Sequence, residues 1–154
     1  MESSATSFLE PFFDTARDDP DRPAVVDNGL VLTYGAFAAW VLAVAAAVEP
    51  RTAEPQPPVG VVVHHSARDV AAILGVLAAG RAYVPLEAHH PEARLEEILR
   101  RVGCREAVTT AENGWQPAVE KVITLRWAPA PAASAAAVLT PACLPPASRP
   151  ALPA

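Results

Sequence analysis

Cysteine and basic charge are both scarce in this chain, and each shortage excludes a class of function. Cys104 and Cys143 are its two cysteines, too few and too far apart for a disulfide framework or a thiolate metal site. The formal net charge is -5, and arginines are interspersed with glutamates, so no basic patch can neutralise the phosphates of a nucleic acid. We therefore expect reduced thiols and no DNA or RNA partner.

The chain also lacks a long hydrophobic run, and its first residues do not predict a secretory leader. The apolar stretch over residues 37–48 is a dozen residues long, short of the roughly 20 that cross a bilayer, and it predicts a buried helix. The first residues show no basic segment followed by an apolar core. These features predict a cytoplasmic protein that makes no use of a membrane.

Glycine is missing from the C-terminal part, and lysine is nearly absent from the whole chain. No glycine follows Gly114, and Lys121 is the only lysine. From residue 128 onward the sequence has seven of the 17 prolines, one charged residue and no aromatic residue. Burial within such a segment cannot offset its ordering entropy, so we expect a folded unit over 1–127 and a disordered Pro/Ala-rich tail over 128–154.

The rest of the chain has the composition of one globular domain, with 154 residues in all, 51% apolar and 19% charged. Apolar residues at helical spacing predict a short helix over 7–18, with Ser7 as its N-cap. Two β-prone runs, 23–27 and 30–33, flank Asn28-Gly29, a pair that favours a tight hairpin turn. Thr33 is placed to cap the next helix, over 34–48.

Strands and helices then alternate, which predicts βαβ units and a parallel sheet. A proline-rich loop over 49–58 separates this part from the preceding helix. Gly80 and Gly103 are expected to end two of the later helices. The predicted strands are 59–63, 82–86, 106–109 and 121–125, and the helices between them are 67–79 and 94–102.

Residues 74–95 carry the most specific motif. They read L-G-V-L-A-A-G-R-A-Y-V-P-L-E-A-H-H-P-E-A-R-L and resemble the signature L-K-A-G-x-A-Y-V-P-L-D-P-x-x-P-x-x-R-L of amino-acid-activating adenylation domains in nonribosomal peptide synthetases. Arg81 falls on a free position, Glu87 stands where Asp is usual, and Ala88 replaces a proline. The A-Y-V-P-L form points to this branch of the adenylate-forming, AMP-binding superfamily rather than to acyl-CoA ligases or luciferases.

The resemblance extends from about Phe12 to Thr110. Residues 19–26, D-P-D-R-P-A-V-V, are similar to the family's T-P-D-x-P-A-V-V, and residues 32–34 are similar to the start of its L-T-Y-x-E-L motif. Ala36 replaces the Glu of that motif and Phe37 its second Leu, and residues 59–63 have lost the Asp of G-D-x-V-A-V. The resemblance implies the α/β, parallel-sheet N-terminal subdomain of an adenylate-forming enzyme, with an N-terminal β-hairpin.

In that family the early motifs are structural, and the resemblance implies that ATP, magnesium and an amino acid serve the parent enzyme through later segments. A Gly-, Ser- and Thr-rich loop ending in P-K-G must wrap the phosphates, because only glycine lets backbone N–H groups approach closely. Residues 137–150 replace its glycines with Pro and Ala. The substrate pocket and the catalytic lysine are also missing, and Lys121 lies outside any matching motif.

We therefore expect a truncated amino-acid-activating domain of secondary metabolite biosynthesis that does not adenylate alone. A frameshift, a premature stop or a trimmed gene would produce such a chain. The alternative is a non-catalytic module that docks onto another synthetase module or completes the remainder of an adenylation domain, through the apolar surface that a truncated subdomain would expose. An independent nucleotide-binding α/β protein is disfavoured, because it would need a phosphate loop.

No residue is assigned a catalytic, cofactor-binding or metal-binding role. The pairs His64-His65 and His89-His90 have no Cys, Asp or Glu at ligand spacing, so solvated histidines are favoured over a metal site. The first pair follows the carboxyl end of a predicted parallel strand, which leaves a ligand-binding role open. Cys104 has no flanking base. The remaining candidate residues are interpreted as structural. Tyr83 and Pro85 are expected to be packing elements. A solvated helix face with ion pairs such as Glu96 to Arg100 is expected to consist of Glu92, Glu96, Glu97, Arg94, Arg100 and Arg101.

Overall fold

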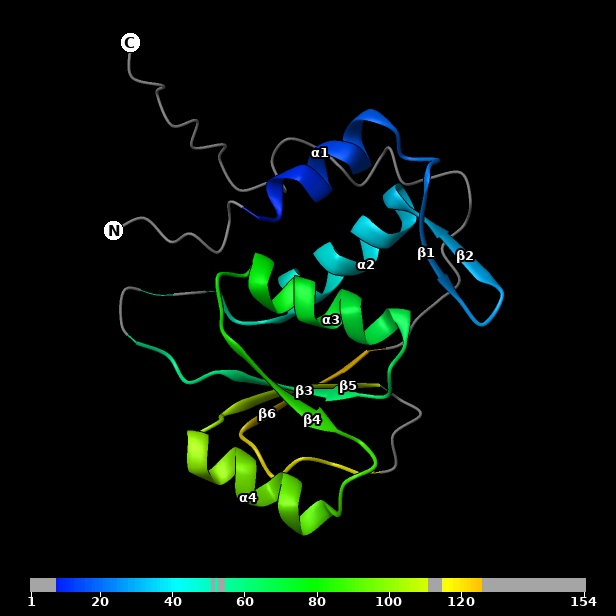
Figure 1. Ribbon diagram of the computed structural model, residues 1–154. Helices are drawn as coiled ribbons and strands as arrows, with labels where there is room; N and C mark the ends of the chain where they lie inside the picture. Colours follow the sequence, from blue (N-terminus) through cyan, green and yellow to red (C-terminus); the bar gives the residue numbers. More distant parts are fainter. Residues whose placement is uncertain (1–7, 51, 53–54, 111–114, 126–154) are drawn as a thin grey trace.

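The computed structural model describes residues 8–50, 52, 55–110 and 115–125 and forms a layered α/β structure. A parallel sheet has α2 and α3 on one face and α4 on the other, and α1 packs outside α2 (Figure 1). The predicted fold class is confirmed. The elements are α1 (Glu10–Asp18), β1 (Pro23–Asp27), β2 (Leu30–Thr33), α2 (Tyr34–Ala47), β3 (Val59–Val63), α3 (Ala67–Ala78), β4 (Tyr83–Glu87), α4 (Glu92–Val102), β5 (Glu106–Thr110) and β6 (Lys121–Leu125).

The sheet has the strand order β4-β3-β5-β6, and all its neighbouring strands are parallel. All five residues of β3 are buried, as expected for a central strand covered on both faces. Val59, Val61 and Val63 pack toward α2 and α3, whereas Val62 packs toward α4. The regular register between β3 and β4 pairs Val63 with Glu87, so the two strands end side by side.

Helices α2 and α3 form the layer above the sheet. Thr33 Oγ1 accepts a hydrogen bond from the backbone N–H of Ala36 at 3.3 Å, which confirms Thr33 as the cap of α2. The buried carboxylate of Asp69 accepts hydrogen bonds from the backbone N–H groups of His64, at 2.7 Å, and Ser66, at 2.8 Å. Asp69 therefore fixes the loop that leads from β3 into α3.

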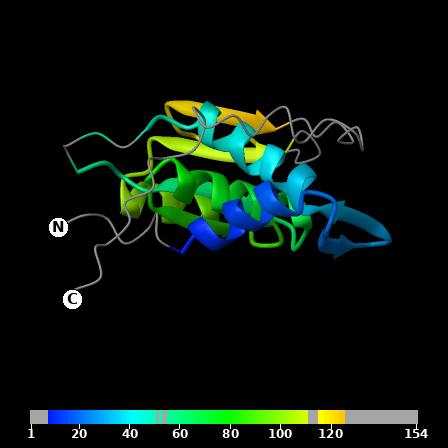
Figure 2. The same ribbon diagram turned by 90° about the horizontal axis from the view of Figure 1, so that it is seen from above.

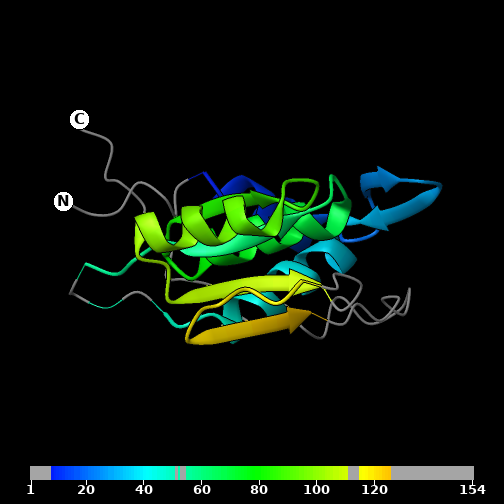
Figure 3. The ribbon, with the colours of Figure 1, turned by 90° about the horizontal axis from the view of Figure 1, so that it is seen from below.

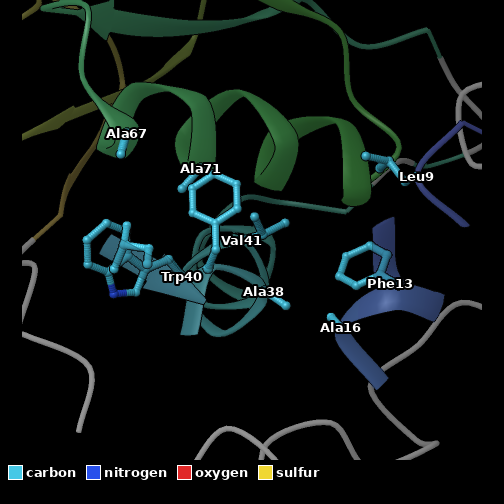
Figure 4. Close-up of a cluster of buried hydrophobic side chains, with 10 residues drawn as sticks. Leu9, Phe13, Ala16, Ala38, Trp40, Val41, Ala67 and Ala71 are labelled. Carbon is cyan, nitrogen blue, oxygen red and sulfur yellow. The ribbon is translucent and has the colours of Figure 1, made fainter. Parts of the chain in front are cut away.

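The N-terminal part closes over this layer. Helix α1 begins at Glu10 with Leu9 in the cap position, so the expected cap at Ser7 is wrong, and Ser7 itself lies outside the described residues. Phe13 and Leu9 enter a cluster with Val41 of α2 and Ala71 of α3 (Figure 4). The apolar stretch predicted to be a buried helix is thus buried along one side, against α1, α3 and the sheet, whereas Ala43 and Ala46 are exposed.

The β1–β2 hairpin projects beyond the helices at one end of the molecule (Figure 2). Asn28 and Gly29 have φ values of 48° and 83°, the left-handed conformation that the predicted turn requires. Asp27 Oδ2 accepts a hydrogen bond from the backbone N–H of Ala67 at 2.9 Å and ties the hairpin to the start of α3.

The opposite face is covered by α4, which lies on the β3–β4 side of the sheet with β5 and β6 beside it (Figure 3). Leu95 and Leu99 pack there against Val62 and Leu86. The helix begins at Glu92 rather than at the expected residue 94, because the carbonyl of Pro91 already accepts the first hydrogen bonds.

The expected ion pair between Glu96 and Arg100 is wrong. Glu97 pairs with both Arg100 and Arg101. The hydrogen bond from Arg100 has the largest effect, followed by that from Arg101, and both lower the pKa of the Glu97 carboxyl. Glu96 instead accepts a hydrogen bond from the backbone N–H of Ala118 at 3.1 Å. The Glu96 carboxylate therefore binds the segment before β6, and not Arg100 as the i, i+4 spacing predicts.

The predicted tail over 128–154 lies outside the described residues. Within the described ranges, none of the helices combines the length and the apolar character that a bilayer crossing demands.

Candidate functional site

Polar side chains gather where β3 and β4 end, at the carboxyl edge of the sheet. His64 and His65 follow β3, Glu87 is the last residue of β4, and His89 and His90 occupy the turn before α4. The backbone N–H of Ala88 donates to the carbonyl of Val63 at 3.0 Å, so the ladder continues to the end of both strands. Ligands of open α/β sheets bind at this edge.

Glu87 lies between two imidazoles. Its Oε2 atom is 3.0 Å from Nε2 of His65 and 3.7 Å from Nδ1 of His89, and ligand atoms of the three side chains lie within 4.8 Å of one another. The sequence interpretation found no acidic residue at ligand spacing, and the structure corrects it. The missed signal was topological, because parallel neighbours end together and bring Glu87 beside the loop after β3.

A hollow of about 370 Å³ adjoins this cluster, between the hairpin, the start of α3 and the outer face of β4. His65, Glu87, Tyr83 and Pro85 line part of it. Tyr83 and Pro85 are exposed, so the expectation that they are packing elements is wrong for the described structure. Strand alternation explains this result: Val84 and Leu86 take the face toward α4, and residues 83, 85 and 87 take the face toward the hollow.

An ionic cluster occupies the opposite, amino edge of the sheet. Arg81 Nη1 is 3.3 Å from Glu106 Oε2 and donates to the carbonyl of Glu49 at 2.9 Å, while Arg81 Nη2 donates to the carbonyl of Pro57 at 2.9 Å. Lys121 Nζ is 3.0 Å from Glu106 Oε1 and donates to the carbonyl of Ala47 near the end of α2. The cluster joins α2, the proline-rich loop, the segment before β4 and the strands β5 and β6, which makes its role structural.

Cys104 also lies at the amino edge, just before β5, and it packs against the end of the proline-rich loop. Its Sγ is 2.8 Å from the carbonyl oxygen of Pro58 and donates to it. Burial raises the pKa of the Cys104 thiol, against smaller opposing effects of Gly60 and Arg81. A buried thiol with a raised pKa is a poor nucleophile.

Alkylation of Cys104 is therefore expected to be at least about tenfold slower than that of glutathione at pH 8. A raised pKa leaves less thiolate at any pH below it, and the contact with Pro58 hinders access. The rate would be measured with iodoacetamide on a Cys143→Ser chain, with urea-unfolded protein as the control that restores ordinary reactivity. A native rate equal to that of glutathione would contradict this account.

Four glycines of the described residues have surroundings that can be compared with a phosphate-binding loop. A Cβ on Gly60 would meet side-chain atoms of Leu86 and Leu99 at 3.0 Å, and one on Gly75 would meet Val44 at 2.4 Å, so both glycines face packed side chains. Gly29 and Gly103 serve single turns. None of these four glycines therefore supplies the closely approachable backbone that wraps nucleotide phosphates.

Comparisons with known proteins agree on one relationship. The model of the family described as AMP-binding enzyme matches residues 12–147. Surfactin synthase subunit 1 of Bacillus subtilis (strain 168) is 39% identical over 94 residues, which are 61% of this chain and 3% of that protein. A crystal structure of the nonribosomal peptide synthetase FmoA3 is 30% identical with a TM-score of 0.70, covering 90% of this chain and 14% of that one.

A third comparison concerns the fold alone. The N-terminal subdomain of Klebsiella oxytoca NpsA is 22% identical with a TM-score of 0.59, covering 75% of this chain and 31% of that one. The predicted N-terminal subdomain fold is confirmed. The chain spans 3% to 9% of the length of the first curated relatives. The family match continues to residue 147, beyond the limit near Thr110 that the motifs suggested.

Proposed function

The chain belongs to the AMP-binding enzyme family. On that basis we propose that it is part of an amino-acid-activating adenylation domain of nonribosomal peptide synthesis. The observation that carries this proposal is the A-Y-V-P-L segment, which forms β4 in register with the central strand, within a chain similar to several peptide synthetases. The whole enzyme would activate an amino acid with ATP and magnesium for secondary metabolism. Since such a reaction consumes ATP, we place the chain in the cytoplasm.

The proposal assigns this chain a structural contribution to the domain and no adenylation alone. Supporting it are the close packing around Gly60 and Gly75 and the absence of any glycine after Gly114. Lys121, the only lysine, is held by Glu106 and the end of α2 rather than placed near an open site. The family match through residue 147 favours an in-frame origin for the segment after residue 125 over a frameshift.

A chimera tests the family role directly. The 94-residue matched segment of surfactin synthase subunit 1 would be replaced by the corresponding residues of this chain, and amino-acid-dependent ATP–pyrophosphate exchange would be measured. We expect exchange to persist with the parent's amino acid preference, because the transplanted segment builds the fold and not the pocket. A folded chimera without exchange would overturn the proposal.

The isolated chain supplies the second arm of this test. With each of the 20 common amino acids, ATP–pyrophosphate exchange by the purified full chain is expected to stay at the buffer level. Intact surfactin synthase subunit 1 serves as the positive control. Amino-acid-dependent exchange by the chain alone would contradict the proposed lack of adenylation while leaving the family role standing.

The second candidate function is a non-catalytic module that docks onto a synthetase or completes a separate partial adenylation domain. The hairpin favours it, since Val26, Leu30 and Val31 are 71%, 48% and 54% exposed. Within the described residues, β4 and β6 each pair on one side, which leaves their outer edges open. Solubility that depends on a co-expressed partner module would support docking, whereas a monodisperse, cooperatively folding monomer would count against it.

A further inference from the structure

We propose that His65, Glu87 and His89 bind one divalent transition-metal ion at the carboxyl edge of the sheet. The three residues come from separate segments: the loop after β3, the end of β4 and the turn before α4. This site is unrelated to nucleotide chemistry, because it uses none of the family's phosphate-binding features. It goes beyond the proposed function, and its test does not depend on that function.

The distances suit a small ion. A metal with ligands at about 2.0–2.2 Å in tetrahedral geometry places neighbouring ligand atoms about 3.3 Å apart. The separations from Glu87 Oε2 are 3.0 Å to His65 Nε2 and 3.7 Å to His89 Nδ1, and no pair in the trio exceeds 4.8 Å. A small rotation of the histidine side chains would equalise these distances.

The donor types select the class of metal. Two imidazoles and one carboxylate suit zinc, nickel, cobalt or copper, whereas magnesium and calcium take oxygen ligands almost exclusively. The side chains of His65 and His89 are 75% and 68% exposed, so an ion can enter without opening the fold. Three protein ligands leave at least one coordination position for water.

Glu87 provides an independent reason for a cation here. Its Oε2 atom is buried and has no hydrogen-bond partner, although His65 Nε2 lies 3.0 Å away. A buried carboxylate oxygen without a donor is costly, and a metal ion between the imidazoles would satisfy it. The ladder to β3 fixes the backbone at Glu87, so its side chain leaves the strand on the same side as the hollow.

His65 has an unusual backbone. Its φ of 61° is in the left-handed region, where residues other than glycine are uncommon. That conformation places the His65 imidazole against Glu87 while Asp69 holds the neighbouring N–H groups of the loop. Observed strain of this kind is concentrated at binding sites, because surrounding contacts must maintain it.

Isothermal titration of the tag-free full chain with zinc chloride tests the assignment. We expect saturable binding of one ion per chain, and at least tenfold weaker binding after His65→Asn, Glu87→Gln or His89→Gln. Asparagine is chosen at position 65 because it tolerates positive φ. His64→Gln is the matched control: it removes a neighbouring imidazole that faces Asp69, and it should change the affinity less than twofold.

A cobalt titration tests whether a cysteine is among the ligands, and circular dichroism shows that each variant keeps its fold. The cobalt complex should show d–d absorption without a thiolate charge-transfer band, which would otherwise implicate a cysteine. The proposal is overturned if zinc does not bind saturably, or if the folded Glu87→Gln and His89→Gln variants bind as tightly as wild type. It is equally overturned if His64→Gln weakens binding as much as His65→Asn does.

Discussion

Replacing Glu106 with alanine is expected to lower the free energy of unfolding by about 3 kcal/mol or more. The Glu106 and Arg81 side chains are 5% and 6% exposed, so the substitution leaves a buried guanidinium without its carboxylate. Lys121 loses its 3.0 Å contact with the same carboxylate. Glu106 Oε1 also accepts a hydrogen bond from the backbone N–H of Glu49 at 3.2 Å, which links the end of α2 to the sheet.

Urea denaturation of the full chain measures this effect, and Glu120→Ala is the matched control. Glu120 also pairs with an arginine, through two 2.9 Å hydrogen bonds with Arg105, but both side chains are 65% exposed. The pair lowers the pKa of Glu120, yet water and salt screen it, so its loss should produce little measurable change. Equal effects of the two substitutions would show that burial of Glu106 does not stabilise the fold.

The sequence predicts the elements well wherever the signal is local. Asn28-Gly29 sets its own turn, Thr33 caps the helix that directly follows it, and Gly103 adopts the left-handed conformation that ends α4. The unbroken valine-rich run of β3 predicts a central strand for a similar reason, since burial on both faces removes the need for polar alternation. Each of these features depends on neighbours within a few residues.

The candidate sites escape prediction because they join distant segments. Arg81 falls on a free position of the adenylation signature, yet it is buried and contacts Glu106 across 25 residues of sequence. His65 and Glu87 lie close together because the register of β3 and β4 aligns the ends of the two strands. The sequence of either strand alone does not determine that register. Residue spacing along the chain therefore does not predict these side-chain pairs, because the parallel sheet brings their members together at its two edges.

The position of β4 in the sheet explains why Tyr83 and Pro85 are exposed. The β4 segment has an apolar sequence that predicts packing on both faces, but β4 is an outer strand of the described sheet and α4 covers one of its faces. Tyr83 and Pro85 are left on the other face, beside the hollow under the hairpin. An apolar run cannot reveal whether its strand is central or outer, because that depends on which strands pair with it.

Gly75→Val is expected to lower the free energy of unfolding by about 3 kcal/mol. Gly75 lies in α3 where that helix packs against α2, and a Cβ there would come within 2.4 Å of Val44 Cβ and 2.8 Å of the Val41 carbonyl oxygen. Neither atom can move alone, because one is fixed to the backbone and the other is part of it. The helices must separate, and the clash outweighs the roughly 1 kcal/mol by which glycine itself disfavours a helix.

The comparison of Gly75→Ala, Gly75→Val and Ala93→Val by urea denaturation isolates the packing effect. Ala93 is exposed on α4, so a valine there carries the helix-propensity cost without a collision. We expect the Ala93 variant to stay within about 0.5 kcal/mol of wild type, and Gly75→Ala to fall between it and Gly75→Val. If Gly75→Ala were more stable than wild type, α2 and α3 could separate at no cost, and close approach at Gly75 would not explain this glycine.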